Sequence, residues 1–263
     1  MTAYIKSKDG IPIEDWMFSA YLGFNHFGLN IILFEEIEEV PCKKDIILVS
    51  YIDETQKWFK KMGWIENPQL PSIPFNEEFY NLKEIKKGDH LYNFKIKMKD
   101  VRDNKFEYPF FMKSVGLKEF IPTIISNRNV LDYQDLSKID DNCHIQLFPV
   151  IKNIESEWRV YVIDNEIVKV CNYLGNSFYN DVFHFKSYIF GIICMFQFCF
   201  PDRKTYSLDI AEYVGEKEEY NYELIEYNDF WSLGNYGLSP KEYALGLLRR
   251  WKEIIIMNKN IKI

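Results

Sequence analysis

Residues Tyr206 to Gly237 read YSLDIAEYVGEKEEYNYELIEYNDFWSLGNYG, in which two alternating stretches flank a charged segment. Alternation of apolar and polar residues over several positions is typical of a β-strand with one buried face. It predicts one strand over Tyr206–Ile210 and a second over Tyr222–Asn228. The sequence therefore predicts a hairpin of two strands with a charged tip.

Oxygen-bearing side chains gather on one face of this predicted hairpin. Side chains two positions apart on a strand share a face, so Glu226 and Asn228 point the same way, and Asp209 joins them if the strands pair. Three oxygen ligands without sulfur or imidazole suit a hard cation such as Mg²⁺, which usually also holds substrate phosphates. The same pattern also fits a solvated hairpin whose acidic side chains face water.

Composition narrows the class of protein. The 263 residues are 47% hydrophobic and 17% aromatic, which is enough for one large domain or two small ones with a substantial core. The net charge of −7 weighs against nucleic acid as the main partner, because such binding depends on neutralising phosphates. Five cysteines without a CxxC spacing disfavour a disulfide framework or a zinc site.

The apolar segments of the sequence indicate where in the cell the protein is located. The first residues lack the apolar core of a signal peptide. The most apolar run, Tyr188 to Phe200, is too short to cross a bilayer and suits a buried helix. We therefore expect a cytoplasmic protein without a membrane partner, and the oligomeric state stays open.

The N-terminal region predicts a small α/β unit. Helices are expected at Ile13–Leu22 and Glu54–Met62, and strands at Leu29–Phe34 and Asp45–Tyr51. Three prolines between Asn67 and Pro74 indicate an extended connector, which is the first candidate domain boundary.

The rest of the chain predicts a larger α+β region. Its expected strands are Leu91–Lys99, Tyr108–Val115, His144–Val150 and a hairpin over Glu157–Tyr173 that turns at Asp164-Asn165. Its expected helices are Val130–Ile139, Asn180–Phe200 and a last one that begins at Ser239-Pro240 and runs to about Met257.

Basic side chains in predicted strands supply a counterpart to the acidic hairpin. Lys113 lies in an otherwise apolar strand, Lys118 follows past a glycine, and Arg159 lies in the strand that starts at Glu157. An unpaired buried charge is costly, so such residues reach solvent, pair with an acid such as Glu157, or face a cleft. Two lysines and an arginine, combined with acidic metal ligands, would form a site for a polyphosphate. The motifs Walker A, GxGxxG, HExxH and GxSxG are absent.

Four motifs occur in a fixed order: FFMKSVGLKEF (110–120), EWRVYVIDNEIVKVCNY (157–173), YSLDIAEY (206–213) and ELIEYNDFWSLGNYG (223–237). In this order they resemble the ATP-grasp fold, and in particular the clade named for one arginine and two lysines. The resemblance implies an α/β (α+β) fold with an N-terminal pre-ATP-grasp α/β domain at residues 1–75. A two-subdomain ATP-grasp domain would follow at 76–263, with the small subdomain at about 91–150 and the large one at about 151–263.

The resemblance also implies ATP and Mg²⁺ as cofactors and assigns roles to single residues. The side chains implied to act on the phosphates, and to be catalytic, are Lys113, Lys118 and Arg159. Those implied to hold adenine or ribose are Gln146, Leu147, Phe148 and Glu157. The implied metal ligands are Asp209, Glu226 and Asn228.

The activity implied by the resemblance is ligation of a carboxylate to an amine or thiol through an acyl-phosphate, with release of ADP and phosphate. Small-molecule or peptide carboxylates and amines would be the substrates. Two alternatives stay open: a nucleotide-binding interaction module without turnover, and a kinase-like phosphotransferase. The first follows from Ser114, which stands where the family usually has proline, and from the short loop between Lys113 and Lys118.

Overall fold

The computed structural model describes residues 1–64, 94–103, 108–114, 120–132, 136–175, 185–215 and 219–259. Within these ranges the fold is mixed α/β, with three four-stranded sheets. The chain divides into two compact units. The larger unit combines Met1–Pro71 with Asn153–Ile263, and the smaller unit is Ser72–Lys152.

The N-terminal sheet of the larger unit is centred on β1 (Thr2–Lys8). β1 pairs in parallel with β3 (Asn30–Phe34) and β4 (Ile46–Val49), and its end pairs antiparallel with the short β2 (Ile11–Pro12). The helices of this region are α1 (Asp15–His26), α2 (Ile52–Lys61) and the 3₁₀ helix η1 (Ile37–Glu39). The four elements expected before residue 65 are confirmed, but β1 was not predicted.

The missed strand is mostly buried. Its buried residues are Ala3, Tyr4, Ile5 and Ser7. Two lysines in this seven-residue stretch make the strand hard to recognise from the sequence. Lys6 can lie in β1 because its ammonium donates to Glu54 Oε1 at 2.6 Å. A charge neutralised by a residue 48 positions away in the chain cannot be foreseen from local sequence.

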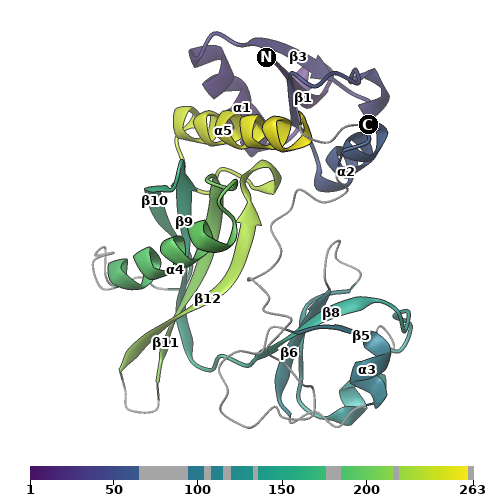
Figure 1. The fold of residues 1–263 in the computed structure, drawn as a ribbon, viewed down its shortest axis with the longest axis vertical. Helices are drawn as coiled ribbons and strands as arrows, with labels where there is room; N and C mark the ends of the chain where they lie inside the picture. Colours follow the sequence, from purple (N-terminus) through teal and green to yellow (C-terminus); the bar gives the residue numbers. More distant parts are fainter. Residues whose placement is uncertain are drawn as a thin grey trace. The chain divides into compact units, whose positions relative to one another are not determined.

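The last helix, α5 (Pro240–Lys259), lies beside α1 (Figure 1). It shares a hydrophobic core with the N-terminal region. It begins with the predicted capping signal: the Glu242 amide donates to Ser239 Oγ at 3.3 Å, and the Ser239 amide donates to Glu242 Oε2 at 2.8 Å. Trp251 of α5 packs against Trp58 of α2, with ring centroids 6.1 Å apart. The two ends of the chain therefore fold together.

The second sheet of the larger unit is antiparallel, in the order β10-β9-β11-β12. Its strands are β9 (Ile154–Ile163), β10 (Glu166–Gly175), β11 (Tyr206–Val214) and β12 (Tyr220–Asp229), and a 3₁₀ helix, η4 (Phe230–Ser232), follows. Both predicted hairpins are confirmed. Asp164 and Asn165 turn the first one with φ of +54° and +67°, values that these two residue types tolerate.

Helix α4 (Lys186–Cys199) covers one face of this sheet (Figure 1). Phe196 packs on Tyr206 and Tyr227, with ring centroids 4.0 and 4.7 Å away. The predicted helix over Asn180–Phe200 is confirmed from residue 186, and residues 180–184 lie outside the described ranges. None of the described helices has the length and apolarity needed to cross a bilayer.

The smaller unit holds a sheet in the order β5-β8-β6-β7. Its strands are β5 (Phe94–Lys97), β6 (Phe110–Ser114), β7 (Thr123–Ile125) and β8 (His144–Pro149); its helices are α3 (Met98–Asp103) and the 3₁₀ helix η3 (Arg128–Asp132). The strand expected to reach Lys99 ends at Lys97, because Asp100 Oδ2 accepts the Lys97 amide at 3.1 Å and α3 starts. Residues 91–93 lie outside the described ranges.

The α-helix predicted over Val130–Ile139 is wrong for the described residues: Val130–Asp132 belong to the 3₁₀ helix η3, and residues 133–135 lie outside the described ranges. Beyond η3, residues 136–138 form a turn. The guanidinium of Arg102, on α3, donates to the carbonyl oxygens of Leu136 at 2.9 Å and Ile139 at 3.0 Å. Arg102 of α3 therefore hydrogen-bonds the backbone carbonyls of the segment that was predicted to end the helix, and this segment forms a turn instead.

The boundaries of the predicted domains stay a prediction. The compact units record which parts of the chain pack together, and they join the first 71 residues to residues after 152. Packing of this kind does not test the predicted division between residues 75 and 76.

Candidate functional site

Four side chains form a row across the second sheet of the larger unit. Arg159 on β9 lies directly opposite Cys171 on β10 and Asp209 on β11, and Asp209 lies opposite Glu226 on β12. Alternation along β11 places Asp209 on the face opposite Tyr206, which packs against α4. The row therefore lies on the face of the sheet that α4 leaves uncovered.

Arg159 and Asp209 form a two-pronged ion pair at the centre of this row. Arg159 Nε donates to Asp209 Oδ1 at 2.7 Å, and Nη2 donates to Oδ2 at 2.6 Å. The side chains are only 11% and 4% exposed. Planar guanidinium and carboxylate groups match in this geometry, which fixes both side chains.

Asn228 completes the predicted set of three ligands on this face. Its amide nitrogen, as assigned, donates to Asp209 Oδ2 at 3.0 Å. The predicted metal ligands Asp209, Glu226 and Asn228 are thus brought together on two neighbouring strands, in the hairpin that the sequence predicted.

A β-bulge in β12 lies directly before Glu226. Asp209 pairs with Glu226, but the next residue of β11, Ile210, pairs with Leu224, so Ile225 is an extra residue. An extra residue in a strand reverses which face of the sheet the following side chains point to. Leu224 and Tyr227 are therefore both buried although three positions separate them.

Burial raises the pKa of Asp209, with Glu226 and Glu157 acting in the same direction and the Arg159 guanidinium opposing them. A buried carboxylate with two others near it gains from a further positive charge. Among the described residues no three His, Cys, Asp or Glu side chains group as a metal site. Two carboxylates and an amide oxygen nevertheless fit Mg²⁺, which commonly takes one or two carboxylates and completes its shell with water and phosphate oxygens.

Tyr236, for which the sequence predicted no role at the phosphates, contacts Arg159. The ring centroid of Tyr236 lies 4.6 Å from the Arg159 Cζ. Tyr236 belongs to the Asn235-Tyr236-Gly237 turn that follows η4, and this turn signal was the available hint. The contact between Tyr236 and Arg159, which are far apart in the sequence, depends on the fold.

The predicted residues of the smaller unit lie on its sheet. Lys113 on β6 pairs in register with Gln146 on β8, and the Lys113 ammonium lies 5.1 Å from the ring centroid of Phe148. Gln146 is fully buried, and Leu147 belongs to the hydrophobic core. Lys118 lies outside the described residues. Glu157 belongs to the larger unit, on β9, opposite Ala211.

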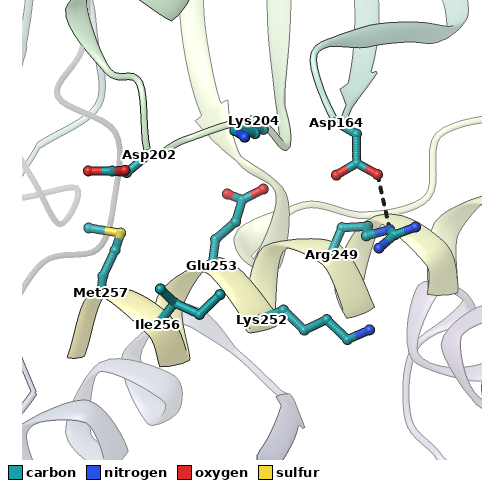
Figure 2. A pocket seen from close by; sticks show the side chains of 8 residues that line it. All are labelled: Asp164, Asp202, Lys204, Arg249, Lys252, Glu253, Ile256 and Met257. Carbon is teal, nitrogen blue, oxygen red and sulfur yellow. Dashed lines mark ion pairs between the residues drawn. The ribbon is translucent and has the colours of Figure 1, made fainter. Parts of the chain in front are cut away.

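A surface pocket of about 390 Å³ lies elsewhere in the larger unit, beside α5 (Figure 2). Arg249 pairs with Asp164 across it at 3.0 Å, and Lys204, Lys252, Asp202 and Glu253 also line it. None of the predicted site residues lines this pocket. Its balanced charges offer no preference for phosphate, and we assign it no role.

Comparisons with known proteins identify what this chain is similar to. A family model for the ATP-grasp domain, described as family 2 of the clade named for one arginine and two lysines, matches residues 94–245, more than half of the chain. A comparison with curated proteins finds no match.

Three solved structures share the fold at low sequence identity. A RimK domain ATP-grasp protein from Sphaerobacter thermophilus has a TM-score of 0.52 and 8% identity, over 98% of this chain and 99% of the other. The ATP-grasp ligase PsnB complexed with minimal precursor has a TM-score of 0.50 and 11% identity, over 95% and 99%. N5-carboxyaminoimidazole synthetase from Staphylococcus aureus has a TM-score of 0.50 and 10% identity, over 95% and 77%.

Proposed function

The chain belongs to the ATP-grasp domain family, in family 2 of the arginine–lysine clade, and on this basis we propose that it is an ATP-dependent ligase. In this proposal it joins a carboxylate to an amine or thiol through an acyl-phosphate and releases ADP and phosphate. The observation that supports this best is the row of Arg159, Asp209 and Glu226, in which an arginine and two carboxylates lie side by side on the sheet face that α4 leaves uncovered. Cytoplasmic location remains part of the proposal.

Each residue has a chemical task in the proposed reaction. An oxygen of the acceptor carboxylate attacks the γ-phosphorus of ATP, and the bond from that phosphorus to the β–γ bridging oxygen breaks, which leaves ADP. Arg159 donates hydrogen bonds to the transferred phosphoryl group, and Lys113 and Lys118 neutralise phosphate oxygens. The amine or thiol then attacks the acyl carbon and displaces phosphate.

Asp209, Glu226 and Asn228 would hold Mg²⁺, whose charge offsets that of the phosphate oxygens. The strand that carries Gln146, Leu147 and Phe148 would offer its backbone groups to adenine, and Glu157 would accept hydrogen bonds from the ribose hydroxyls. The ligase PsnB, which is similar in fold, is complexed with a minimal precursor.

The test is a product assay on the full chain. The protein is incubated with Mg-ATP and pools of acids, peptides, amines and thiols, and ADP, AMP and phosphate are quantified. ADP formation that requires both an acid and an amine or thiol supports the ligase. AMP with pyrophosphate would point to adenylate chemistry instead and contradict it.

A second candidate is a nucleotide-binding module without turnover. It is favoured by the closed Arg159–Asp209 pair, because the arginine that would act on the phosphoryl group already makes two hydrogen bonds to a carboxylate. ATP binding without ADP formation across the same pools would favour this candidate. ADP formation with an acid alone would favour the kinase-like phosphotransferase.

A further inference from the structure

The loop between η4 and α5 places the ring of Tyr236 against the Arg159 guanidinium. The ring centroid lies 4.6 Å from Arg159 Cζ, within the range at which an aromatic face attracts a cation. Tyr236 keeps 53% of its surface exposed, so it is not held there by burial in the core.

Hydrogen bonds fix this loop on both sides of Tyr236. Before it, the Tyr161 hydroxyl donates to the Gly234 carbonyl at 3.3 Å. After it, the Lys169 ammonium donates to the Gly237 carbonyl at 2.6 Å. Both donors come from the sheet that carries Arg159, from β9 and β10.

The backbone at Tyr236 is strained. Its φ is +25°, and the next residue, Gly237, has φ of +87°. Positive φ is rare for a residue with a bulky side chain, and glycine or asparagine would meet the backbone requirement at lower cost. Strain of this kind persists where the surroundings impose it and is concentrated at functional sites. The backbone alone therefore gives no reason for a tyrosine here.

Two contacts of different kind fix the orientation of Arg159. Asp209 accepts two hydrogen bonds along one edge of the guanidinium, and the guanidinium carbon lies over the ring of Tyr236. The contact with Asp209 weakens if this carboxylate turns toward a metal ion. The contact with Tyr236 does not depend on the carboxylate and remains.

We propose that Tyr236 is a positioning residue that keeps the Arg159 guanidinium aligned for the γ-phosphate of ATP. This inference rests on the proposed function, in which Arg159 contacts the transferred phosphoryl group. Its consequence is specific: the preference of the protein for ATP over ADP depends on an aromatic ring at position 236.

The test compares nucleotide affinities of the full chain by calorimetric titration with Mg-ATP and Mg-ADP. Tyr236→Phe keeps the ring and retains the wild-type ratio of ATP to ADP affinity. Tyr236→Leu loses the ring at similar bulk and lowers that ratio roughly five- to tenfold, with little change in ADP affinity.

Two further variants separate positioning from stability. Tyr236→Asn relieves the backbone, so its melting temperature equals or exceeds that of wild type while its ATP-to-ADP ratio falls as in Tyr236→Leu. Tyr220→Leu is the matched control, because Tyr220 at the start of β12 is also 53% exposed, and it keeps the wild-type ratio.

The possible outcomes are distinct. A wild-type ratio in Tyr236→Leu, or an equal loss in Tyr220→Leu, overturns the role of Tyr236 and leaves the proposed function intact. Wild-type protein that binds neither nucleotide overturns the proposed function and this inference together.

Discussion

Arg159 and Asp209 face each other on neighbouring strands where water reaches little of either side chain. Taking two charges out of water is costly, and their attraction repays that cost only while both are present. Replacing one of them leaves a buried charge without its partner. A charge change in this pair should therefore affect folding as well as any chemistry.

We predict that the single substitutions Arg159→Met and Asp209→Leu each lower the free energy of unfolding by about 3 kcal/mol. The double variant should lose about 2 kcal/mol less than the sum of the two, because it leaves no unpaired charge. Urea unfolding of the four proteins measures the cycle. Additive losses would mean that the two side chains do not stabilise each other.

The exposed ion pair between Arg249 and Asp164 is the control for this cycle. Its side chains are 45% and 51% exposed. Asp164→Asn keeps a residue that tolerates the positive φ of the turn, and we expect it to cost less than about 1 kcal/mol. A loss as large as that of the buried pair would show that burial is not the deciding factor.

Helices α1 and α5 pack closely because a glycine stands at their contact. A Cβ atom on Gly23 would lie 2.0 Å from the carbonyl oxygen of Pro240 and 2.4 Å from the Ala244 Cβ. The backbone of α5 cannot yield as a flexible side chain would. The position therefore requires glycine for space rather than for conformation.

We predict that Gly23→Ala destabilises the protein by about 2 kcal/mol, although alanine favours a helix. The matched control is Gly191→Ala in α4, where nothing lies within 4 Å of an added Cβ. That substitution should stabilise by up to about 1 kcal/mol, the difference in helix propensity. Chemical denaturation measures both, and equal effects would contradict the close packing of α1 on α5.

At the scale of the whole molecule, the first 64 residues and α5 form one hydrophobic core. It includes Trp58 and Phe59 of α2 together with Leu247, Trp251 and Ile254 of α5. A protein shortened to residues 76–263, the predicted ATP-grasp domain, would expose that side of α5 to water.

We therefore predict that the 76–263 fragment expresses as an aggregating or loosely packed protein that binds a hydrophobic dye. Adding a separate chain of residues 1–75 should restore solubility and the near-ultraviolet circular dichroism of tryptophan. A fragment that is soluble and rigidly packed alone would show that the N-terminal region is not needed for this core.

Local sequence signals predicted much of the fold, and long-range contacts decided the rest. The Asp164-Asn165 turn, the strands of the Tyr206–Asp229 hairpin and the cap at Ser239 follow from neighbouring residues. The resemblance to the ATP-grasp clade and the α/β (α+β) fold are likewise confirmed. The turn after η3 was missed because Arg102, distant in sequence, bonds the carbonyls of a segment that reads as a helix.

The candidate site divides in the same way. That Asp209, Glu226 and Asn228 share a face was predictable from alternation, because the bulge at Ile225 precedes both Glu226 and Asn228 on β12. The bulge at Ile225 and the contact of Tyr236 with Arg159 were not, because pairing register and loop packing set them. The roles of all these residues, and of Lys113 and Lys118, stay predictions.

Binding of ATP with and without Mg²⁺, in wild type and Glu226→Gln, tests the proposed site most directly. Glu226→Gln keeps the Arg159–Asp209 pair and removes one charge from the predicted metal ligands. Since changes to groups that merely support metal ligands often cost tenfold or more, calorimetry should show Mg²⁺-dependent binding in wild type that falls at least about tenfold in the variant. ATP binding that does not require Mg²⁺, or that Glu226→Gln leaves unchanged, would contradict a magnesium–nucleotide site on this hairpin.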